Sequence, residues 1–264
     1  MRDVTYWVVN GAVTALFRLL GVRFTVRGDE HIPREGGAVL ASNHVSYLDF
    51  TFVGRAGRRR GRWVRFMSKE AVFDPPVVRS VMRAMRHIPV DRSNGVAALR
   101  TGVRTARAGE LVGVFPEATI SRSFTIKGAK AGAAAIAVWE QVPLLPVVVW
   151  GSQRLLTTGP RWSLRRGTAV TVLIGEPMHP GPDADPYAVT AELRARLATL
   201  LEQAMEDYPQ DPRDAGDRWW VPAVRGGDAP TREVASQLEE ESLQRREAAR
   251  EAKRQAALDA RKRA

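Results

Sequence analysis

From residue 22 to residue 207, short apolar segments alternate with segments that favour helices, and this pattern restricts the possible folds more than any other feature. The segments expected to form strands are 22–27, 37–41, 88–90, 111–115, 143–151 and 170–174, with one more strand where the basic loop 58–65 ends. Those expected to form helices are 50–56, 69–85 with a break at Pro75 and Pro76, 95–108, 129–140 and 187–207. Strands that alternate with helices are typical of α/β domains, in which helices flank a sheet. We therefore predict one α/β domain over residues 23–208.

The N-terminal residues 1–22 are predicted to form a separate helical region. Residues 4–22 are strongly apolar, but Asn10, Gly11 and Arg18 interrupt them, so the run is too short and too polar to span a bilayer. We expect an amphipathic helix at the membrane interface, with its arginines near lipid headgroups. The alternative is a helix docked on the protein core.

The composition changes after Pro209, where the pattern of the core ends. Residues 209–230 are rich in Pro, Asp and Gly, which predicts a linker. Residues 231–264 carry many charges and hardly any large apolar side chains. Such a segment forms at most an exposed helix, so we expect a charged tail that is helical or disordered.

The net charge of +11 indicates an anionic partner. The sequence has no signature of a DNA-binding or RNA-binding fold, so nucleic acid is not the expected partner. The expected partner is an anionic phospholipid membrane. The sequence contains no cysteine, which excludes disulfides, thiol catalysis and cysteine-bound metal.

The strongest candidate for catalysis is a histidine directly after the apolar run 37–41. A strand ending at Ala41 would place His44 in a strand-to-helix turn, where open α/β sheets bind ligands. Asp49 follows five residues later and could fold back onto one ring nitrogen, which leaves the other nitrogen to accept a proton. A histidine oriented by an aspartate activates hydroxyl groups, and no nucleophilic serine motif is present, so the hydroxyl could belong to a substrate. The alternative is that Asp49 is only a charge in the first turn of a helix.

A second candidate lies after the apolar segment 111–115. Pro116 and Glu117 follow it directly, and the cations Arg122 and Lys127 come soon afterwards. Cations at the end of a strand favour phosphate binding. An ordinary strand-to-helix turn with surface charges is the alternative.

Four stretches in order resemble the motifs of the lysophospholipid acyltransferase family, typified by bacterial 1-acylglycerol-3-phosphate acyltransferases. They are Asn43-His44-Val45-Ser46-Tyr47-Leu48-Asp49, Ile88-Pro89-Val90-Asp91-Arg92, Phe115-Pro116-Glu117-Ala118-Thr119 and Val142-Pro143-Leu144-Leu145-Pro146-Val147. The resemblance covers about residues 1–207. It implies the fold of glycerol-3-phosphate acyltransferases, a single mixed, largely parallel sheet flanked by helices.

The resemblance also implies an activity and a set of site residues. His44 would take a proton from an acceptor hydroxyl and Asp49 would orient it, while the hydroxyl attacks an acyl thioester. The implied substrate-binding residues are Asn43, Arg92, Phe115, Pro116, Glu117, Ala118, Thr119, Pro143 and Pro146, to which charge adds Arg122 and Lys127. The acyl donor would be acyl-CoA or acyl-carrier protein, and neither a metal nor another cofactor is implied.

The implied acceptor is 1-acyl-sn-glycerol-3-phosphate, which would give phosphatidic acid at the cytoplasmic face of the cell membrane. Three residues depart from the family pattern: Ala118 and Ile120 stand where a Gly and an Arg are common, and Arg86 stands where a Gly is usual. Arg122 or Lys127 could replace the missing Arg. Glycerol-3-phosphate or a glycolipid is an alternative acceptor, and a non-enzymatic basic membrane-binding protein is an alternative function. The sequence leaves the oligomeric state open.

Overall fold

The structure of the chain is a computed structural model that describes residues 4–91, 95–159 and 165–263. The chain divides into two compact units. The first unit comprises Met1–Ser121 and Ile126–Asp211, and the second comprises Arg122–Thr125 and Pro212–Ala264. The motif-bearing stretches of the sequence lie in the first unit.

Seven strands form one sheet in the described part of the chain, in the order β1-β7-β6-β2-β5-β3-β4. Their bounds are β1 Arg23–Arg27, β2 Ala38–Ser42, β3 Val64–Lys69, β4 Ile88–Val90, β5 Leu111–Val114, β6 Leu144–Trp150 and β7 Ala169–Ile174. All neighbouring strands are parallel except β6 and β7, which are antiparallel. This topology confirms the prediction of a single mixed, largely parallel sheet.

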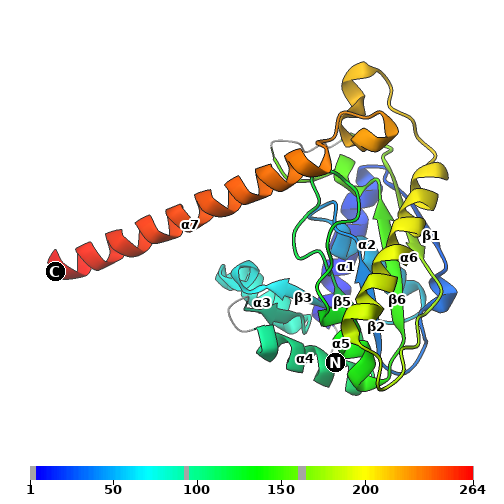
Figure 1. Cartoon of the computed structure of the whole chain (residues 1–264), viewed down its shortest axis with the longest axis horizontal. Helices are drawn as coiled ribbons and strands as arrows, with labels where there is room; N and C mark the ends of the chain where they lie inside the picture. The colour runs from blue at the N-terminus through cyan, green and yellow to red at the C-terminus, as the bar shows by residue number, and fades with distance from the viewer. Residues whose placement is uncertain (1–3, 92–94, 160–164, 264) are drawn as a thin grey trace. The chain divides into compact units, whose positions relative to one another are not determined.

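Helices cover both faces of the sheet (Figure 1). The helices of this unit are α1 Val4–Leu19, α2 Asp49–Arg59, α3 Pro76–Ala84, α4 Gly95–Arg107, α5 Gly132–Glu140 and α6 Pro186–Glu206, with short 3-10 helices η1 Asp29–His31, η2 Glu70–Phe73 and η3 Ser152–Arg154. Helices α4, α5 and α6 pack side by side on one face, and α1 and α2 lie on the other. Because both faces are covered, every residue of β2 and β6 is buried.

The two central parallel strands β2 and β5 determine where the candidate residues meet. Ala41 of β2 lies opposite Val114 of β5, so the two strands end at the same edge of the sheet. The segments after these strands begin with Asn43 and Phe115. Because the carboxyl ends of parallel strands meet at one edge, these two segments lie next to each other.

Helix α1 has one face on the protein and one face turned outward. The buried Tyr6 donates a hydrogen bond to the Val64 carbonyl (2.5 Å), and Phe17 stacks on Phe52 of α2 at 4.8 Å. The outward face is mostly apolar: its exposed members are Val4, Trp7, Val8, Gly11, Ala12, Ala15, Leu16 and Leu19, together with the charged Arg18 in the last turn. No helix in the described ranges is long and apolar enough to cross a bilayer. The helix is therefore docked on the core and at the same time presents an apolar stripe to its surroundings.

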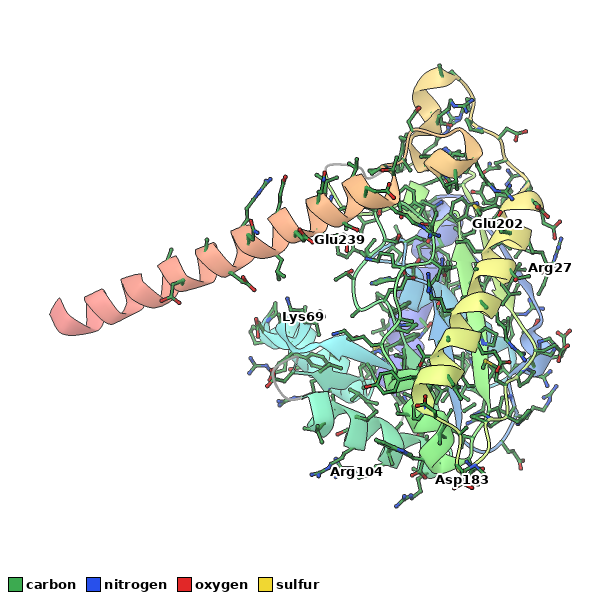
Figure 2. The ribbon with its side chains drawn as sticks, viewed as in Figure 1. Arg27, Lys69, Arg104, Asp183, Glu202 and Glu239 are labelled. Carbon is green, nitrogen blue, oxygen red and sulfur yellow. The ribbon has the colours of Figure 1, made fainter. Side chains whose placement is uncertain are left out.

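Charged side chains cover the outer surface of the first unit. Arg104 projects outward from α4, and Arg27 of β1 reaches Asp207 beyond the end of α6, with 2.6 Å between the guanidinium and the carboxylate (Figure 2). Exposed ion pairs of this kind contribute little to stability. Exposed apolar side chains gather on α1 and also at the start of α3, where Val77 and Val78 are exposed.

The second unit contains the short 3-10 helices η4 Ala215–Trp220 and η5 Ala223–Arg225 and the long helix α7 Arg232–Arg263. The segment Arg122–Thr125 belongs to it: Phe124 lies 6.5 Å from Trp219 between ring centroids, and Arg232 donates a hydrogen bond to the Thr125 hydroxyl (3.2 Å). Residues 209–230, which we expected to be a linker, thus contribute most of their length to a compact unit. The sequence did not indicate this because the partner segment lies about a hundred residues earlier.

Candidate active site

His44 and Asp49 form the pair that the sequence predicted. His44 Nδ1 lies 2.9 Å from Asp49 Oδ2, and the Asp49 side chain is fully buried. The His44 side chain is 20% exposed. The pair therefore has one nitrogen, Nδ1, facing the carboxylate, while the ring can be reached from outside.

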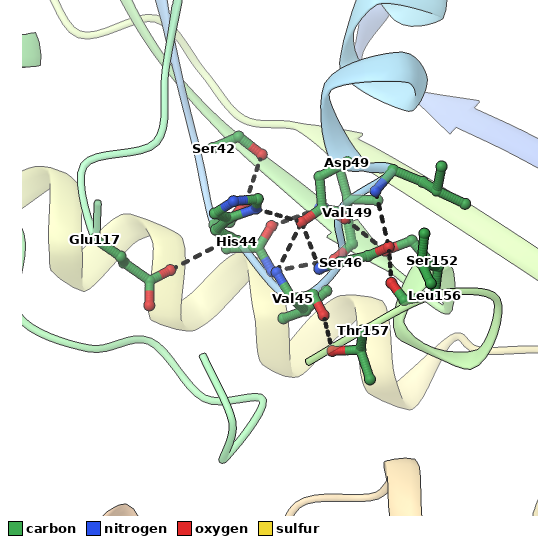
Figure 3. A network of polar contacts seen from close by, with 12 residues as sticks. Ser42, His44, Val45, Ser46, Asp49, Glu117, Val149, Ser152, Leu156 and Thr157 are labelled. Atoms are coloured by element: carbon green, nitrogen blue, oxygen red, sulfur yellow. Dashed lines mark hydrogen bonds and ion pairs between the residues drawn. The ribbon is translucent and has the colours of Figure 1, made fainter. Parts of the chain in front are cut away.

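The Asp49 carboxylate accepts hydrogen bonds from four donors (Figure 3). Besides His44, Oδ2 accepts from the backbone N–H groups of Val45 (2.7 Å) and Ser46 (2.8 Å). Oδ1 accepts from the Ser152 hydroxyl at 2.6 Å. These bonds arise because Asp49 is the first residue of α2 and its side chain turns back into the preceding loop. They replace the hydration that the carboxylate loses on burial.

Phe115 fixes the plane of the His44 ring. The two ring centroids lie 4.2 Å apart with an interplanar angle of 22°, and Phe66 of β3 stacks on the other side of Phe115 at 5.9 Å. Phe115 follows β5 directly, so the parallel pairing of β2 and β5 brings the two rings together. The imidazole is thus held by a hydrogen bond at its edge and by an aromatic ring on its face.

Glu117 connects the His44 segment to the segment after β5. Its Oε1 accepts from the His44 N–H (3.1 Å) and its Oε2 from the Lys127 N–H (3.2 Å). The Ser121 N–H donates to the His44 carbonyl (2.7 Å), so His44 is bound on both sides of its backbone. Only 7% of Glu117 is exposed. Burial raises the pKa of its carboxyl to about 7, against the opposite effect of the His44 amide, the Lys127 charge and the Lys127 amide.

These contacts favour a structural role for Glu117 over direct substrate binding, and the same holds for Asn43. The buried Asn43 side chain donates to the Val149 carbonyl (3.1 Å) and accepts from the Val149 N–H (2.8 Å). Its amide therefore extends the pairing of β2 with β6 beyond the end of β2. Both residues hold the loop that carries His44.

Thr119 and Lys127 lie on the exposed side of the segment after β5. The Lys127 ammonium donates to the Thr119 hydroxyl at 2.6 Å. Pro116 is buried and its carbonyl accepts from the Lys130 N–H (2.9 Å). Ile120, at the position where the resemblance expects an arginine, is buried with 7% exposure. The cation available here from the predicted set is therefore Lys127.

Two non-glycine residues adopt left-handed backbone conformations where the family pattern has glycine. They are Ala118 (φ 59°) and Arg86 (φ 58°). A left-handed conformation costs an L-residue about 1 kcal/mol more than glycine. The Arg86 side chain also pairs with Glu110 (2.5 Å), which in turn binds the buried Arg65 (3.1 Å). Both positions thus have the backbone conformation that glycine adopts at the least cost.

The structure does not bring all predicted residues to His44. The Pro143 carbonyl accepts from the Val39 N–H near the start of β2, so Pro143 lies at the opposite edge of the sheet, about 16 Å from His44 at the usual rise of a strand. Pro146 is buried within β6, opposite Ala41. Arg92 lies outside the described residues, and Arg122 belongs to the second unit. The expected binding roles of Arg92 and Arg122 stay predictions.

The sequence analysis missed the loop after β6, Gly151–Thr157, which contacts the His44 segment. Besides Ser152, Thr157 donates to the Val45 carbonyl (2.8 Å), and the Leu156 carbonyl accepts from the Ser46 hydroxyl (2.5 Å). The available signal was a small polar residue, Ser152, two positions after a fully buried strand, since such positions lie at the ligand-binding edge of parallel sheets. In the described ranges, no group of three or more His, Cys, Asp or Glu side chains is placed to hold a metal ion.

Comparisons with known proteins show a likeness to acyltransferases. The family model named Acyltransferase matches residues 23–150. The 1-acyl-sn-glycerol-3-phosphate acyltransferase of Bacillus subtilis is 27% identical over 73% of this chain and 92% of its own length. The chloroplastic 1-acyl-sn-glycerol-3-phosphate acyltransferases of Brassica napus and Arabidopsis thaliana are 31% and 29% identical over 67% and 68% of this chain. The chain spans about half the length of these two plant proteins.

A solved structure shows the same fold. The crystal structure of the 1-acyl-sn-glycerophosphate acyltransferase from Thermotoga maritima superposes with a TM-score of 0.62 and 26% sequence identity. The superposition covers 74% of this chain and 77% of that one. The likeness therefore includes most of the first unit's length.

The raised pKa of Glu117 predicts a pH dependence of stability. Between pH 4.5, the ordinary value, and about 7, the folded protein holds a proton that the unfolded chain has released. The free energy of unfolding should therefore fall by up to about 1.4 kcal/mol per pH unit across this window and level off above it. In Glu117→Gln, the free energy of unfolding should not show the decrease that Glu117 causes. Urea denaturation at pH 5, 6, 7 and 8 measures this.

Glu192→Gln is the matched control, because Glu192 is an exposed residue of α6. It should keep the slope of the wild type. A Glu117→Gln slope equal to that of the wild type would show that Glu117 titrates normally.

Proposed function

We propose that this chain belongs to the lysophospholipid acyltransferase family and moves a fatty acyl group from a thioester to the free hydroxyl of 1-acyl-sn-glycerol-3-phosphate, giving phosphatidic acid. Several relatives carry the name of this activity, and the family model that matches residues 23–150 is named Acyltransferase. The observation that carries the proposal is the His44–Asp49 pair in an accessible position at the carboxyl edge of the sheet.

The chemistry follows from which nitrogen is engaged. Asp49 accepts a hydrogen bond from the His44 Nδ1–H, so Nε2 has a lone pair for the acceptor hydroxyl. As Nε2 takes the proton of the acceptor hydroxyl, the hydroxyl oxygen forms a bond to the thioester carbonyl carbon. The carbon–sulfur bond then breaks, and the imidazolium returns the proton to the leaving thiolate. The buried Asp49 stabilises the imidazolium while the charge is present.

The acceptor phosphate needs a cation near this pair. Lys127 is suited to it, because Glu117 binds the His44 and Lys127 backbones at once and so keeps the two residues close. The Lys127 ammonium donates to the Thr119 hydroxyl, so a cation and a hydroxyl lie together on this segment. We assign Lys127 and Thr119 to the phosphate of the acceptor.

The lipid substrates imply a membrane surface, and α1 supplies a face for it. Trp7 (56% exposed) and Leu19 (70% exposed) lie near opposite ends of the apolar stripe, and the Arg58 guanidinium lies 3.8 Å from the Trp7 ring centroid. An apolar helix face flanked by arginines binds anionic bilayers at the interface. We place the chain peripherally on the cytoplasmic face of the cell membrane, with acyl-CoA or acyl-carrier protein as donor.

Removing the imidazole should abolish the reaction. In His44→Ala, thiol release from palmitoyl-CoA with 1-acyl-sn-glycerol-3-phosphate should fall about a thousandfold, because the general base is lost. The same assay with glycerol-3-phosphate and with lysophospholipids lacking a terminal phosphate monoester identifies the acceptor, and mass spectrometry identifies the product.

His179→Ala is the control, since His179 is exposed in the segment after β7. It should retain full activity. If His44→Ala releases thiol as fast as His179→Ala, His44 is not the base. If the wild type is inactive with acyl-CoA, acyl-carrier protein is the donor to test. Inactivity with both donors would contradict the proposed function.

Loss of the Lys127 ammonium should weaken acceptor binding. Lys127→Ala should raise the KM for 1-acyl-sn-glycerol-3-phosphate about tenfold or more, because a charge-assisted hydrogen bond to phosphate is lost. The KM for the thioester should stay the same. Lys130→Ala removes an exposed cation three residues away and should leave both constants unchanged. Equal effects of the two substitutions would show that Lys127 supplies only general positive charge.

Polar residues on the apolar stripe should release the protein from membranes. The double variant Leu16→Ser and Leu19→Ser should bind vesicles of phosphatidylglycerol and phosphatidylcholine on the order of tenfold more weakly in 0.5 M salt, because less apolar surface is buried. Sedimentation with the vesicles measures this. Trp139→Ser, which changes an exposed aromatic residue of α5 on the other face of the sheet, should bind like the wild type. Unchanged binding of the double variant would exclude α1 as the membrane contact.

A further inference from the structure

The loop Gly151–Thr157, here called the β6 loop, holds the segment between His44 and Asp49. Its Ser152 and Thr157 side chains bind Asp49 and Val45, and its Leu156 carbonyl accepts from the Ser46 hydroxyl and from the Tyr47 N–H (3.3 Å). These contacts join parts of the chain that are over a hundred residues apart (Figure 3). The catalytic loop is therefore built against a second loop.

Among these contacts, the one from Ser152 reaches the carboxylate itself. The three N–H donors on Oδ2 come from His44, Val45 and Ser46, which all lie in the loop that precedes Asp49. They therefore move with that loop. Ser152 binds the other oxygen, Oδ1, from a different strand connection, at 2.6 Å and in a fully buried position. A carboxylate bound at both oxygens from two directions cannot turn about its Cβ–Cγ bond without breaking a hydrogen bond.

The backbone around Ser152 is itself fixed. Gly151 has φ 93°, and a Cβ there would lie 2.2 Å from the Ala169 carbonyl oxygen, so only glycine fits this turn. The Gln153 side chain accepts from the Gly151 N–H (2.9 Å). The Leu155 and Leu156 N–H groups both donate to the Ser152 carbonyl (3.0 and 3.3 Å). The hydroxyl thus comes from a rigid turn that follows the buried central strand β6.

We propose that Ser152 is a positioning residue for acyl transfer: its hydroxyl holds the Asp49 carboxylate in the orientation that keeps His44 Nδ1 bonded and Nε2 directed to the substrate. This assignment rests on the proposed function of His44 as the base. Ser152 itself does not touch the reacting atoms. Its removal should misplace the imidazole without changing the groups that bind the acceptor.

The first test separates turnover from binding. Ser152→Ala should lower kcat for acyl transfer by about 10-fold to 100-fold, the cost of a base displaced by a fraction of an ångström, and leave KM for both substrates within twofold. Ser152→Cys, which keeps a weaker donor of similar shape, should lie between Ser152→Ala and the wild type. If Ser152→Ala fails to fold, Ser152→Cys carries the test alone.

The matched control is Thr190→Val. Thr190 is buried on α6, and its hydroxyl donates to the Pro186 carbonyl (2.7 Å), so the substitution also removes one buried hydroxyl and its hydrogen bond. If the effect of Ser152→Ala were only a loss of stability, kcat would fall in Thr190→Val as well, in proportion to the drop in melting temperature. We expect a similar drop in melting temperature for both variants and a lowered kcat only for Ser152→Ala.

A second measurement does not depend on activity. Diethyl pyrocarbonate reacts with an unprotonated ring nitrogen, and mass spectrometry of the His44 peptide reports its rate. The rate should fall at least threefold in Ser152→Ala, while the exposed His179 peptide, as an internal standard, reacts at an unchanged rate.

The outcomes separate the two proposals. A slower His44 reaction in a protein without acyl transfer would contradict the proposed function and leave the positioning of His44 by Ser152 intact. Unchanged kcat and an unchanged His44 reaction rate in Ser152→Ala would overturn the assignment. An equal fall of kcat in Thr190→Val would overturn it as well.

Discussion

The site depends on one buried carboxylate. Asp49 has no exposed surface, and its two oxygens accept four hydrogen bonds, one of them from His44. A buried charge is tolerated only where hydrogen bonds replace its hydration, so the loop, the start of α2 and the β6 loop must all be in place for the carboxylate to lie there. The order of the strands meets this condition, because β2 lies between β5 and β6, and both neighbours send a segment to the His44 loop.

The segment after β5 and the β6 loop contact different parts of the His44–Asp49 pair. The segment after β5 supplies Phe115 under the ring and Glu117 on the His44 backbone, and it presents Lys127 on its exposed side. The β6 loop supplies the contacts to Asp49 and to its loop. Ala118 in the first segment has a left-handed backbone, the conformation that glycine adopts at the least cost. The acceptor side and the base side of the site are thus held by different strands.

The sequence predicted the elements well because strands that alternate with helices leave a clear periodic signal, and it predicted the His44–Asp49 pair because five residues allow a local turn. The sequence did not predict which strands pair in an antiparallel way. The segment between β6 and β7 is long enough for a crossover to a parallel strand as well as for a return in the opposite direction. The Ser152 contact and the pairing of Asn43 with Val149 each join residues over a hundred positions apart, so they follow only from strand order and register. Sequence also could not show that Glu117 turns toward backbone amides or that Pro143 lies at the far edge of the sheet.

The central claim is that Asp49 fixes the His44 ring with its proton on Nδ1 and a free lone pair on Nε2. The most direct test is the tautomer of the neutral His44 ring, read from the 15N chemical shifts of both ring nitrogens in protein labelled at histidine and assigned by comparison with His44→Ala. We predict a protonated Nδ1 and an unprotonated Nε2, with this preference lost in Asp49→Asn. A ring protonated on Nε2 in the wild type would contradict the account, because that nitrogen could not accept a proton from the substrate.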